Sequence, residues 1–354
     1  MTRIVVAGAG AIGASVAYQL ALLGADDVVL ADPNGVAGGS TSRAMGGVRQ
    51  QFSTAAEVRL AQASIRFFEE LGEAYFRAVG YLFLAETAEG LAELERRRSL
   101  QVALGVPVEQ LAPEQIAELV PGVRTDGVLG GVWCAYDGVA DPAAVARELV
   151  RRASELGVEL HEGVDAVDLD ADVRVIACGP WSAEVGARLG VDLPIRPLCR
   201  QLVETTPIAG LPDRLPMTIE VETGFHFRRK GEALVLALGE KTPRWGFATE
   251  PDTAIAADML ERLRRRYPPA EEAGLARTWG GLYDMTPDAH PIVGQIGEGL
   301  FAACGFSGHG FMQSPAVGRA LAEQILHGES SLDLTPYRLD RFERGIVFPE
   351  TVVL

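Results

Sequence analysis

The sequence is poor in cysteine and histidine, and both shortages argue against a metal site. The four cysteines, Cys134, Cys178, Cys199 and Cys304, are widely spread without paired spacing. This pattern favours neither a disulfide framework nor a zinc or iron–sulfur site. No two of the five histidines stand four residues apart, as a helical metal site would need. We therefore expect buried, reduced thiols and no metal.

Positive charge is also scarce. The chain has 32 Lys and Arg against 48 Asp and Glu, a formal net charge of −16. Nucleic acids and anionic membranes attract basic patches, so neither is expected as a partner. The short basic runs 96–98 and 264–266 sit in polar helical patterns and are interpreted as solvated helix faces.

One long apolar stretch needs explanation, because residues 4–25 are about long enough to cross a bilayer, which takes ~20 residues. Three glycines in its first third, Gln19 in its body, and Asp26 and Asp27 directly after it argue against a membrane span. A signal peptide is disfavoured because the amino end carries only Arg3 and no small-residue cleavage site follows. A soluble, cytoplasmic protein is expected.

The same stretch combines a strand, a glycine turn and a helix. Gly8, Gly10 and Gly13 follow the apolar run 4–7, and Asp32 ends the next apolar run. Gly8 permits a tight turn, Gly10 lets backbone amides approach a pyrophosphate, and Gly13 lets the helix pack closely on the strand. Asp32 can accept from a ribose hydroxyl. Together they predict a dinucleotide site with phosphates at the positive end of the helix.

Chain length and patterning predict two domains of different construction. At 354 residues and 48% hydrophobic, the chain can bury two cores. Short strands alternate with helices at both ends and over 140–192, whereas 193–267 shows longer strands with period-two alternation, typical of an antiparallel sheet. Helices are expected over 54–80, 86–104, 113–119, 142–156, 252–267 and 314–326, and strands over 81–85, 128–135, 158–161, 166–169, 173–177, 225–229, 233–238 and 300–303.

Five motifs, in this order and spacing, resemble one family over essentially the whole chain. They are Gly8–Gly13, Gly39–Ser42 with Gly46–Phe52, Ala177–Ser182, Thr286–Asp288 with Pro291–Gly294, and Gly305–Phe311. The chain is similar to the FAD-dependent amine and amino-acid oxidoreductases, a D-amino-acid oxidase-like family that includes sarcosine oxidase beta subunits, glycine oxidase and L-proline dehydrogenase beta subunits. Residues 46–52 look most like the proline dehydrogenase and sarcosine oxidase beta group.

The resemblance implies an α/β fold with a Rossmann-type FAD-binding domain over 1–80, 140–192 and 275–354, and an antiparallel-sheet α+β substrate domain over 81–139 and 193–274. It implies FAD as cofactor. In the segment 305–310, small residues would let the backbone lie against a flat ring, and the following helix would direct its positive end toward the flavin. The cofactor-binding residues it implies are Gly8, Gly10, Ala11, Ile12, Gly13, Asp32, Pro33, Ser40, Thr41, Ser42, Arg43, Gly46, Gly47, Val164, Ala177, Cys178, Gly179, Trp181, Gly281, Gly305, Ser307, Gly308, His309, Gly310, Phe311 and Met312.

Four residues are predicted to be catalytic: Arg49, His226, Tyr283 and His309. Arg49 could hold a substrate carboxylate or raise the flavin's electron affinity; the alternative is an arginine that anchors a surface loop. His226 and Arg228 share one face of a strand, which either covers the flavin or faces solvent. Tyr283 is either a substrate-site tyrosine or a core aromatic, and His309 either a flavin-side polar group or a core histidine.

Departures from the family pattern refine these expectations. Relatives that attach FAD covalently use a histidine where this chain has Arg43, or a cysteine where it has Gly281, so non-covalent FAD is predicted. Ala237 replaces a lysine credited with oxygen activation, which favours a dehydrogenase. Met312 replaces a lysine that holds the substrate carboxylate, which leaves the substrate preference open. The segment 165–173 is short, so the FAD domain looks trimmed.

The predicted function is oxidation of the C–N bond of a small amino acid or N-methyl amino acid, of the proline, sarcosine or glycine type, by hydride transfer to non-covalent FAD. Electrons would pass to a partner subunit, a quinone or oxygen, and the chain could form a hetero- or homo-oligomer. The alternatives are an oxygen-using sarcosine or glycine-type oxidase, a non-catalytic flavoprotein subunit of a larger complex, or an NAD-only dehydrogenase.

Overall fold

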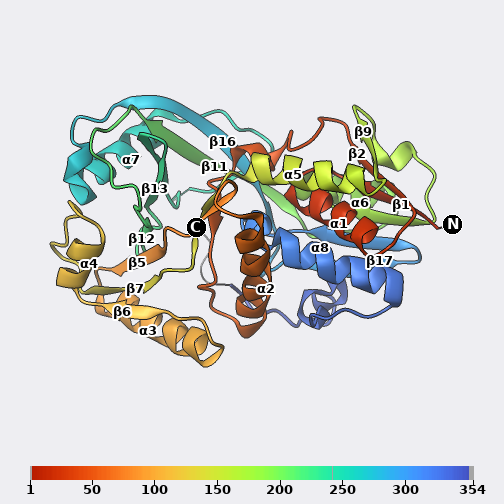
Figure 1. Cartoon of the computed structure of the whole chain (residues 1–354), viewed down its shortest axis with the longest axis horizontal. Coiled ribbons are helices and arrows are strands. Elements are labelled where there is room, and N and C mark those ends of the chain that lie inside the picture. The colour runs from red at the N-terminus through yellow and green to blue at the C-terminus, as the bar shows by residue number, and fades with distance from the viewer. Residues whose placement is uncertain (1, 241, 351–354) are drawn as a thin grey trace.

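The computed structural model describes residues 2–240 and 242–350. Within these ranges the strands form two large sheets, which occupy opposite halves of the elongated molecule in Figure 1, and one small sheet. The small sheet has the order β3 (Gly47–Val48), β8 (Gly138–Ala140) and β4 (Phe76–Arg77). The ends of the predicted FAD domain, residues 1 and 351–354, lie outside the described residues. Mixed parallel and antiparallel sheets confirm the predicted fold class.

The first large sheet is mostly parallel. Its strands are, in order, β17 (Ile292–Gly297), β18 (Leu300–Cys304), β10 (Val173–Ile176), β1 (Arg3–Ala7), β2 (Asp27–Asp32) and β9 (Glu159–Glu162). The pair β17 and β18 is antiparallel. Val5, Val6 and Val29 are fully buried, because helices and turns cover both faces of a parallel sheet. Burial of both faces explains why the sequences of β1 and β2 contain apolar runs that do not alternate with polar residues.

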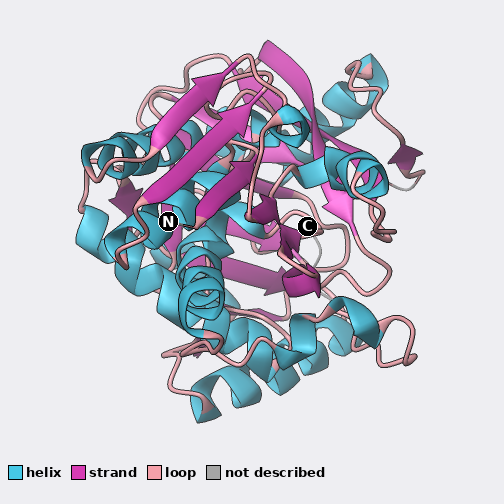
Figure 2. Ribbon diagram, turned by 90° about the vertical axis from the view of Figure 1, so that its right-hand side faces the viewer, coloured by secondary structure: helices cyan, strands magenta, loops and turns pink. Residues whose placement is uncertain are grey.

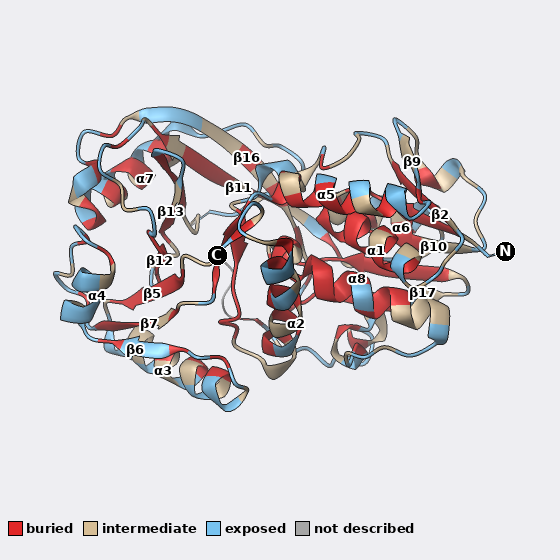
Figure 3. Cartoon of the chain, viewed as in Figure 1, coloured by how far each residue is buried: buried red, intermediate tan, exposed pale blue. Residues whose placement is uncertain are grey.

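Helices from four distant parts of the chain pack on this sheet or beside it. They are α1 (Ala11–Leu22), α2 (Ala55–Leu71), α5 (Pro142–Glu155) and α8 (Gly310–His327). Figure 3 shows α1 buried along most of its length, between α5 and α8. Gly318 of α8 lies so close to Ser15 of α1 that an added methyl group would stand 2.7 Å from the backbone carbon of Ser15. Packing in this core therefore accounts for the apolar stretch over residues 4–25. No helix in the described ranges has both the length and the apolarity to span a membrane.

The second large sheet is mostly antiparallel. Its order is β15 (Arg244–Trp245), β11 (Arg196–Thr205), β14 (Ala233–Ala237), β13 (His226–Lys230), β12 (Met217–Glu220), β5 (Tyr81–Ala85), β7 (Gly130–Cys134) and β6 (Glu109–Leu111), and β16 (Leu275–Met285) also pairs with β11. The outer helices of this half are α3 (Ala88–Ala103), α4 (Pro113–Leu119) and α7 (Thr253–Arg266). Figure 2 shows helices on the outside of the molecule around the strands. Phe225 and Phe227 belong to the core under α7, which leaves the other face of β13 toward the first sheet.

Two predicted elements are wrong in extent or type. The predicted helix over 54–80 ends at Leu71, because Gly72 adopts a positive φ of 81° and the chain turns into β4. The predicted strand over 166–169 is a 3₁₀ turn over Ala166–Asp168. Its backbone bends because the carboxylate of Asp165 accepts the N–H of Val167, a local bond that competes with strand pairing.

Two further expectations need correction. The last helix begins at Gly310 rather than near Ser314, and Pro315 lies inside it. Proline has no N–H to donate to the carbonyl of Phe311, four residues earlier. The hydroxyl of Ser314 donates to that carbonyl instead. The basic runs are only partly solvated. Arg266 is 4% exposed and forms an ion pair with Glu220, which is 2% exposed, because the end of α7 turns toward β12.

The predicted domain boundaries stay a prediction. The strands of the first sheet fall in the ranges predicted for the FAD-binding domain, and those of the second sheet fall in the substrate domain except β16. The boundary at 275 assigns β16 to the FAD-binding part, while its hydrogen bonds run to β11 of the second sheet. This strand therefore connects the two halves, as the arch at the top of Figure 1 shows.

Candidate functional site

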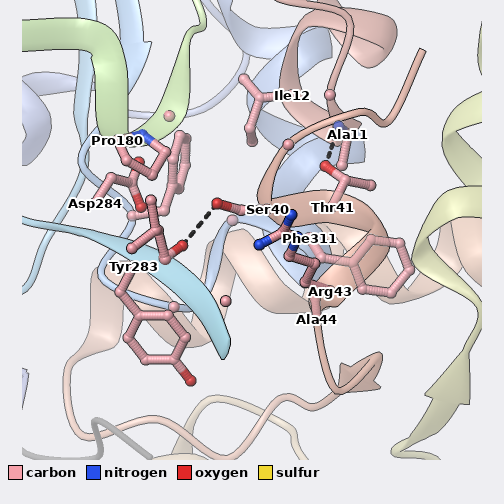
Figure 4. Close-up of a pocket in the computed structure, with 18 of the residues that line it drawn as sticks. Ala11, Ile12, Ser40, Thr41, Arg43, Ala44, Pro180, Tyr283, Asp284 and Phe311 are labelled. Atoms are coloured by element: carbon pink, nitrogen blue, oxygen red, sulfur yellow. Dashed lines mark hydrogen bonds between the residues drawn. The ribbon is translucent and has the colours of Figure 1, made fainter. Parts of the chain in front are cut away.

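A cavity of about 420 Å³ lies where the two large sheets meet. Its lining comes from the turn after β1, the loop 39–49, the end of β10, the start of α8, and the strands β11, β13, β14 and β16. Figure 4 labels lining residues from the start of α1, the loop 39–49, the segment after β10, β16 and the start of α8. The site thus depends on residues from nearly the whole length of the chain.

The glycine turn at one end of the cavity is held in shape by hydrogen bonds. Gly8 has a φ of +101°, and the carboxylate of Asp32 accepts the N–H of Ala9 at 2.8 Å. The hydroxyl of Thr41 accepts the N–H of Ala11 at 3.0 Å, a bond drawn in Figure 4. A methyl group on Gly13 would overlap the carbonyl oxygen of Gly8. The first turn of α1 is therefore fixed against β1, with its positive end at the cavity.

The serine-rich loop is tied to β16. Ser40 donates its hydroxyl hydrogen to the carbonyl of Leu282 at 2.7 Å, and Arg43 donates to the carbonyl of Gly280 at 3.3 Å. The indole N–H of Trp279 donates back to the carbonyl of Arg43. These bonds connect residues more than 230 positions apart in the chain. The loop is therefore a fixed part of the cavity wall rather than a flexible connection.

The start of α8 forms another part of the lining. Gly308 has a φ of +96°, and a Cβ there would run into the ring of Tyr283. His309, Gly310 and Phe311 line the cavity directly after it. The positive end of an eighteen-residue helix thus faces the cavity, where it favours negative charge.

Arg49 is a buried residue rather than the anchor of a surface loop. It is 1% exposed, it donates through Nη1 to the carbonyl of Gln51, and its Nη2 lies 3.2 Å from Nε2 of His309. The guanidinium stacks over the ring of Phe52 at 4.0 Å, and the ring of His309 meets Phe52 edge-on. Burial lowers the pKa of Arg49, although Glu350, Tyr81 and Asp137 oppose this. Arg49 is thus a rigidly held positive charge in the cavity wall.

One face of the second sheet closes the other side of the cavity. His226, Ala237 and Leu202 lie side by side across β13, β14 and β11. Burial lowers the pKa of His226 to about 4. The Nδ1 atom of this neutral imidazole lies 2.8 Å from the carbonyl of Gly224 and donates to it, which leaves Nε2 as an acceptor. Arg228 shares the face but lies outside the lining, where its Nε donates to the carbonyl of Met45.

Most of the predicted site residues share this cavity, but five do not. The predicted residues in the lining are Gly8, Gly10, Ala11, Ile12, Asp32, Pro33, Ser40, Thr41, Arg43, Gly46, Gly47, Arg49, Ala177, Cys178, Gly179, Trp181, His226, Gly281, Tyr283, Gly308, His309, Gly310, Phe311 and Met312. The predicted residues outside the lining are Gly13, Ser42, Val164, Gly305 and Ser307. Gly305 and Ser307 instead shape the turn before α8, where the N–H of Gly305 donates to Asp284. Whether the lining residues bind FAD stays a prediction.

Several lining residues escaped the sequence-based prediction, among them the charged residues Arg200 and Asp284. Arg200 lies on β11 with the apolar Leu198 and Leu202 on either side of it on the same face, and this local break in the apolar pattern was the available signal. Asp284 follows Tyr283, and its carboxylate accepts the N–H of Gly305 at 2.7 Å. Burial raises the pKa of Asp284 to about 6. Sequence alone offered no sign that this acid is enclosed.

The positions used by relatives for covalent attachment meet in this structure. An added Cβ on Gly281 would lie 3.2 Å from Cβ of Arg43. Both positions line the cavity, and neither carries a thiol or an imidazole. The side chains at these positions thus fit a cofactor held without a covalent bond.

Comparison with known proteins agrees with this arrangement. The family described as FAD dependent oxidoreductase matches residues 3–324. The chain is 28% identical to 4-methylaminobutanoate oxidase (formaldehyde-forming) of Paenarthrobacter nicotinovorans over 96% of this chain, but it spans only 45% of that relative's length. It is 26% identical to the sarcosine oxidase subunit beta of Arthrobacter sp., over 98% of this chain and 92% of the relative. The solved structure of L-proline dehydrogenase from P. horikoshii is 29% identical, with a TM-score of 0.91 over 98% of this chain and 99% of the other.

Proposed function

The chain belongs to the family of FAD-dependent oxidoreductases, and from this premise we propose that it oxidises the C–N bond of a small amino acid or N-methyl amino acid by hydride transfer to non-covalently bound FAD. Relatives named as acting on sarcosine, glycine, proline and 4-methylaminobutanoate support this substrate class. A dehydrogenase is favoured, because Ala237 lines the cavity at the position where the resemblance to monomeric sarcosine oxidases implies a lysine credited with oxygen activation.

The observation that carries the proposal is the continuity of the cavity. One lining joins the glycine turn at Gly8 and Asp32 to the segment 308–312 and to the polar face around His226. This combination fits a long cofactor whose nucleotide end and ring end need different surroundings. Both ends also require glycine, since an added methyl group on Gly8 would strike the carbonyl of Ala177 and one on Gly308 would strike the ring of Tyr283.

The lining residues support a proposed place for each part of the cofactor. The turn at Gly8–Gly10 and the start of α1 would hold the pyrophosphate, and Asp32 the ribose. Residues Gly46, Gly47 and 308–312 would surround the ring. FAD, when bound, supplies the hydride acceptor.

The remaining groups position and stabilise. The positive end of α8 and the buried charge of Arg49 favour negative charge that develops on reduction. Nε2 of His226 can accept an N–H from a substrate amine, because this imidazole is neutral at physiological pH. The amine then enters as the free base, and the second sheet excludes bulk water from the reacting carbon.

Electrons would leave to a partner subunit or a quinone. The likeness to a sarcosine oxidase beta subunit supports a hetero-oligomer. The four cysteines are widely spread and suggest no disulfide framework, which supports a cytoplasmic location. An oxygen-using oxidase is the second candidate, since glycine oxidase of Geobacillus kaustophilus is 26% identical over 96% of both chains.

An anaerobic screen tests the proposal. The purified protein should be yellow, and its flavin absorption band should bleach with at least one of proline, sarcosine, dimethylglycine, glycine or a D-amino acid. Slow recolouring in air supports the dehydrogenase, whereas fast recolouring supports the oxidase. Protein that holds FAD but bleaches with none of these amines would be a non-catalytic flavoprotein subunit, and protein without FAD would refute the proposal.

A further inference from the structure

Arg200 is a cavity-lining guanidinium that forms no ion pair with any residue in the ranges 2–240 and 242–350. Its Nε and Nη1 atoms are enclosed, and neither has a hydrogen-bond partner within the described part of the chain. The guanidinium carbon lies 5.8 Å from the ring centre of Tyr283. Enclosing a charged donor without an acceptor is costly unless a ligand supplies one. The position of Arg200 therefore points to an anionic ligand.

Arg49, the arginine favoured by the sequence, differs in this respect. Its Nη1 donates to the carbonyl of Gln51 and its Nη2 contacts His309, so the protein itself engages this guanidinium. The stack on Phe52 fixes its plane. Arg49 is organised as a fixed charge, whereas Arg200 keeps donors for a ligand.

The neighbours of Arg200 supply no anion. Gly281 pairs with it on β16, and Leu202 and Ala237 lie beside it on the same face. Asp284 lines the cavity nearby, but its carboxylate already accepts the N–H of Gly305. Within the described residues no ion pair to Arg200 is formed, so an anionic ligand is the natural partner for its free donors.

The spacing on the sheet suits a small amino acid whose carboxylate and neutral amine lie at opposite ends. Arg200 stands two residues along β11 from Leu202, and His226 stands two strands across from Leu202. With ~3.4 Å per residue and ~4.8 Å per strand, the Cα atoms of Arg200 and His226 are about 12 Å apart. Both side chains line the same cavity, so one small molecule bound there can face both of them.

We propose that Arg200 binds the carboxylate of the substrate, while its amine faces His226, and that Arg200 thereby selects amino acids over simple amines. This deepens the proposed function and rests on it. Arg49 then serves the flavin side of the cavity. Tyr283, beneath the guanidinium, holds Arg200 in place through its ring face.

The test uses a ligand that cannot be oxidised. Cyclopentanecarboxylate has the shape of proline with a methylene in place of the nitrogen, and cyclopentanecarboxamide is its uncharged match. Binding of each to the FAD-loaded protein is followed by the change in the flavin spectrum. In Arg200→Gln the Kd for the carboxylate should rise about 100-fold, because two charge-assisted hydrogen bonds are lost, while the Kd for the carboxamide changes by less than about threefold.

Two further variants make the result decisive. Arg196→Gln on the same strand is the matched control, because Arg196 is exposed and stacks on Trp245, and it should leave both Kd values unchanged. Arg200→Lys keeps the charge without the planar fork and should lose only part of the affinity. It also serves if Arg200→Gln fails to fold.

Several outcomes would overturn the assignment. These are unchanged carboxylate binding in Arg200→Gln, equal loss for carboxylate and carboxamide, or a wild-type protein that binds neither. Loss of carboxylate binding in Arg49→Lys alone would move the role to Arg49. A protein that binds the carboxylate through Arg200 but is reduced by no amino acid would refute the proposed function and leave this assignment intact.

Discussion

A buried ion pair beside the site gives the sharpest quantitative prediction. Glu57 on α2 is 1% exposed and His290 is fully buried, and Nδ1 of His290 lies 2.9 Å from the carboxylate of Glu57. The other ring nitrogen lies 2.6 Å from the carbonyl of Phe348, so both nitrogens donate and the imidazole is protonated. Burial lowers the pKa of His290, but the hydrogen bond and charge of Glu57 outweigh it and raise the pKa above 6.5.

The substitution Glu57→Gln keeps the shape and removes the charge. The carboxylate of Glu57 accepts from both His290 and the amide of Gln313, and a glutamine can accept only one of these while its own amide N–H faces the other. Removing one partner of a buried pair costs about 3–5 kcal/mol, so we expect a loss of about 4 kcal/mol in the free energy of unfolding.

The cost should depend on pH in a definite direction. A histidine whose pKa is raised by folding contributes stability that is fully present below 6.5 and is lost as the pH rises through the raised value. The difference between wild type and Glu57→Gln should therefore be largest at about pH 6 and smaller at about pH 9.

Urea unfolding followed by tryptophan fluorescence measures both effects. The matched control is Glu155→Gln, whose partner Arg151 is 54% exposed; this change should cost about 0–1 kcal/mol at either pH. A cost for Glu57→Gln no larger than that of the control, or a difference that grows with pH, would refute the reasoning.

Two further outcomes concern the cofactor turn and the sheet face. Gly13→Ala puts a methyl group into the carbonyl oxygen of Gly8, so α1 must shift and the Kd for FAD should rise roughly 100-fold in a fluorescence titration. The control Gly274→Ala, whose methyl group would meet only Thr206 at 3.6 Å, should bind FAD as the wild type does. Equal Kd values for the two variants would contradict the role of Gly13. His226→Gln removes a histidine whose pKa falls to about 4 on folding, so its favourable contribution is present above 6.5 and lost as the pH falls to 4. The wild type should therefore lose about 3 kcal/mol relative to this variant between those pH values, and parallel pH profiles would contradict the assigned pKa.

Local patterns in the sequence specified several elements correctly. The helix α5 begins where Asp141 caps it and Pro142 occupies its first turn, and β13 alternates between the core and the cavity as its period of two requires. Where the prediction of an element was wrong, a hydrogen bond from a neighbouring side chain determined the backbone conformation. The hydroxyl of Ser314 lets α8 continue through Pro315, and the carboxylate of Asp165 turns a predicted strand into a 3₁₀ segment.

Part of the site could likewise be predicted from neighbouring residues, whereas another part depends on residues far apart in the chain. The placement of Gly8 and Asp32 on one cavity wall follows from the strand and helix that flank them. The contact between Arg49 and His309 joins positions 260 residues apart, and no periodic pattern in the sequence predicts it. That two donors of Arg200 lack a partner among the described residues is likewise visible only once β16 has paired with β11.

By itself, the sequence determined which backbone shapes are possible, since a turn at Gly8 and the close approach of Gly13 are set by atoms within a few residues. It thereby determined the dinucleotide-binding start of the chain and the family to which it belongs. Only the tertiary structure decided which charges are paired. Contacts between segments far apart in the chain pair Arg266 with Glu220, whereas Nε and Nη1 of Arg200 have no hydrogen-bond partner within residues 2–240 and 242–350, and neither state depends on the residues next to it in the chain.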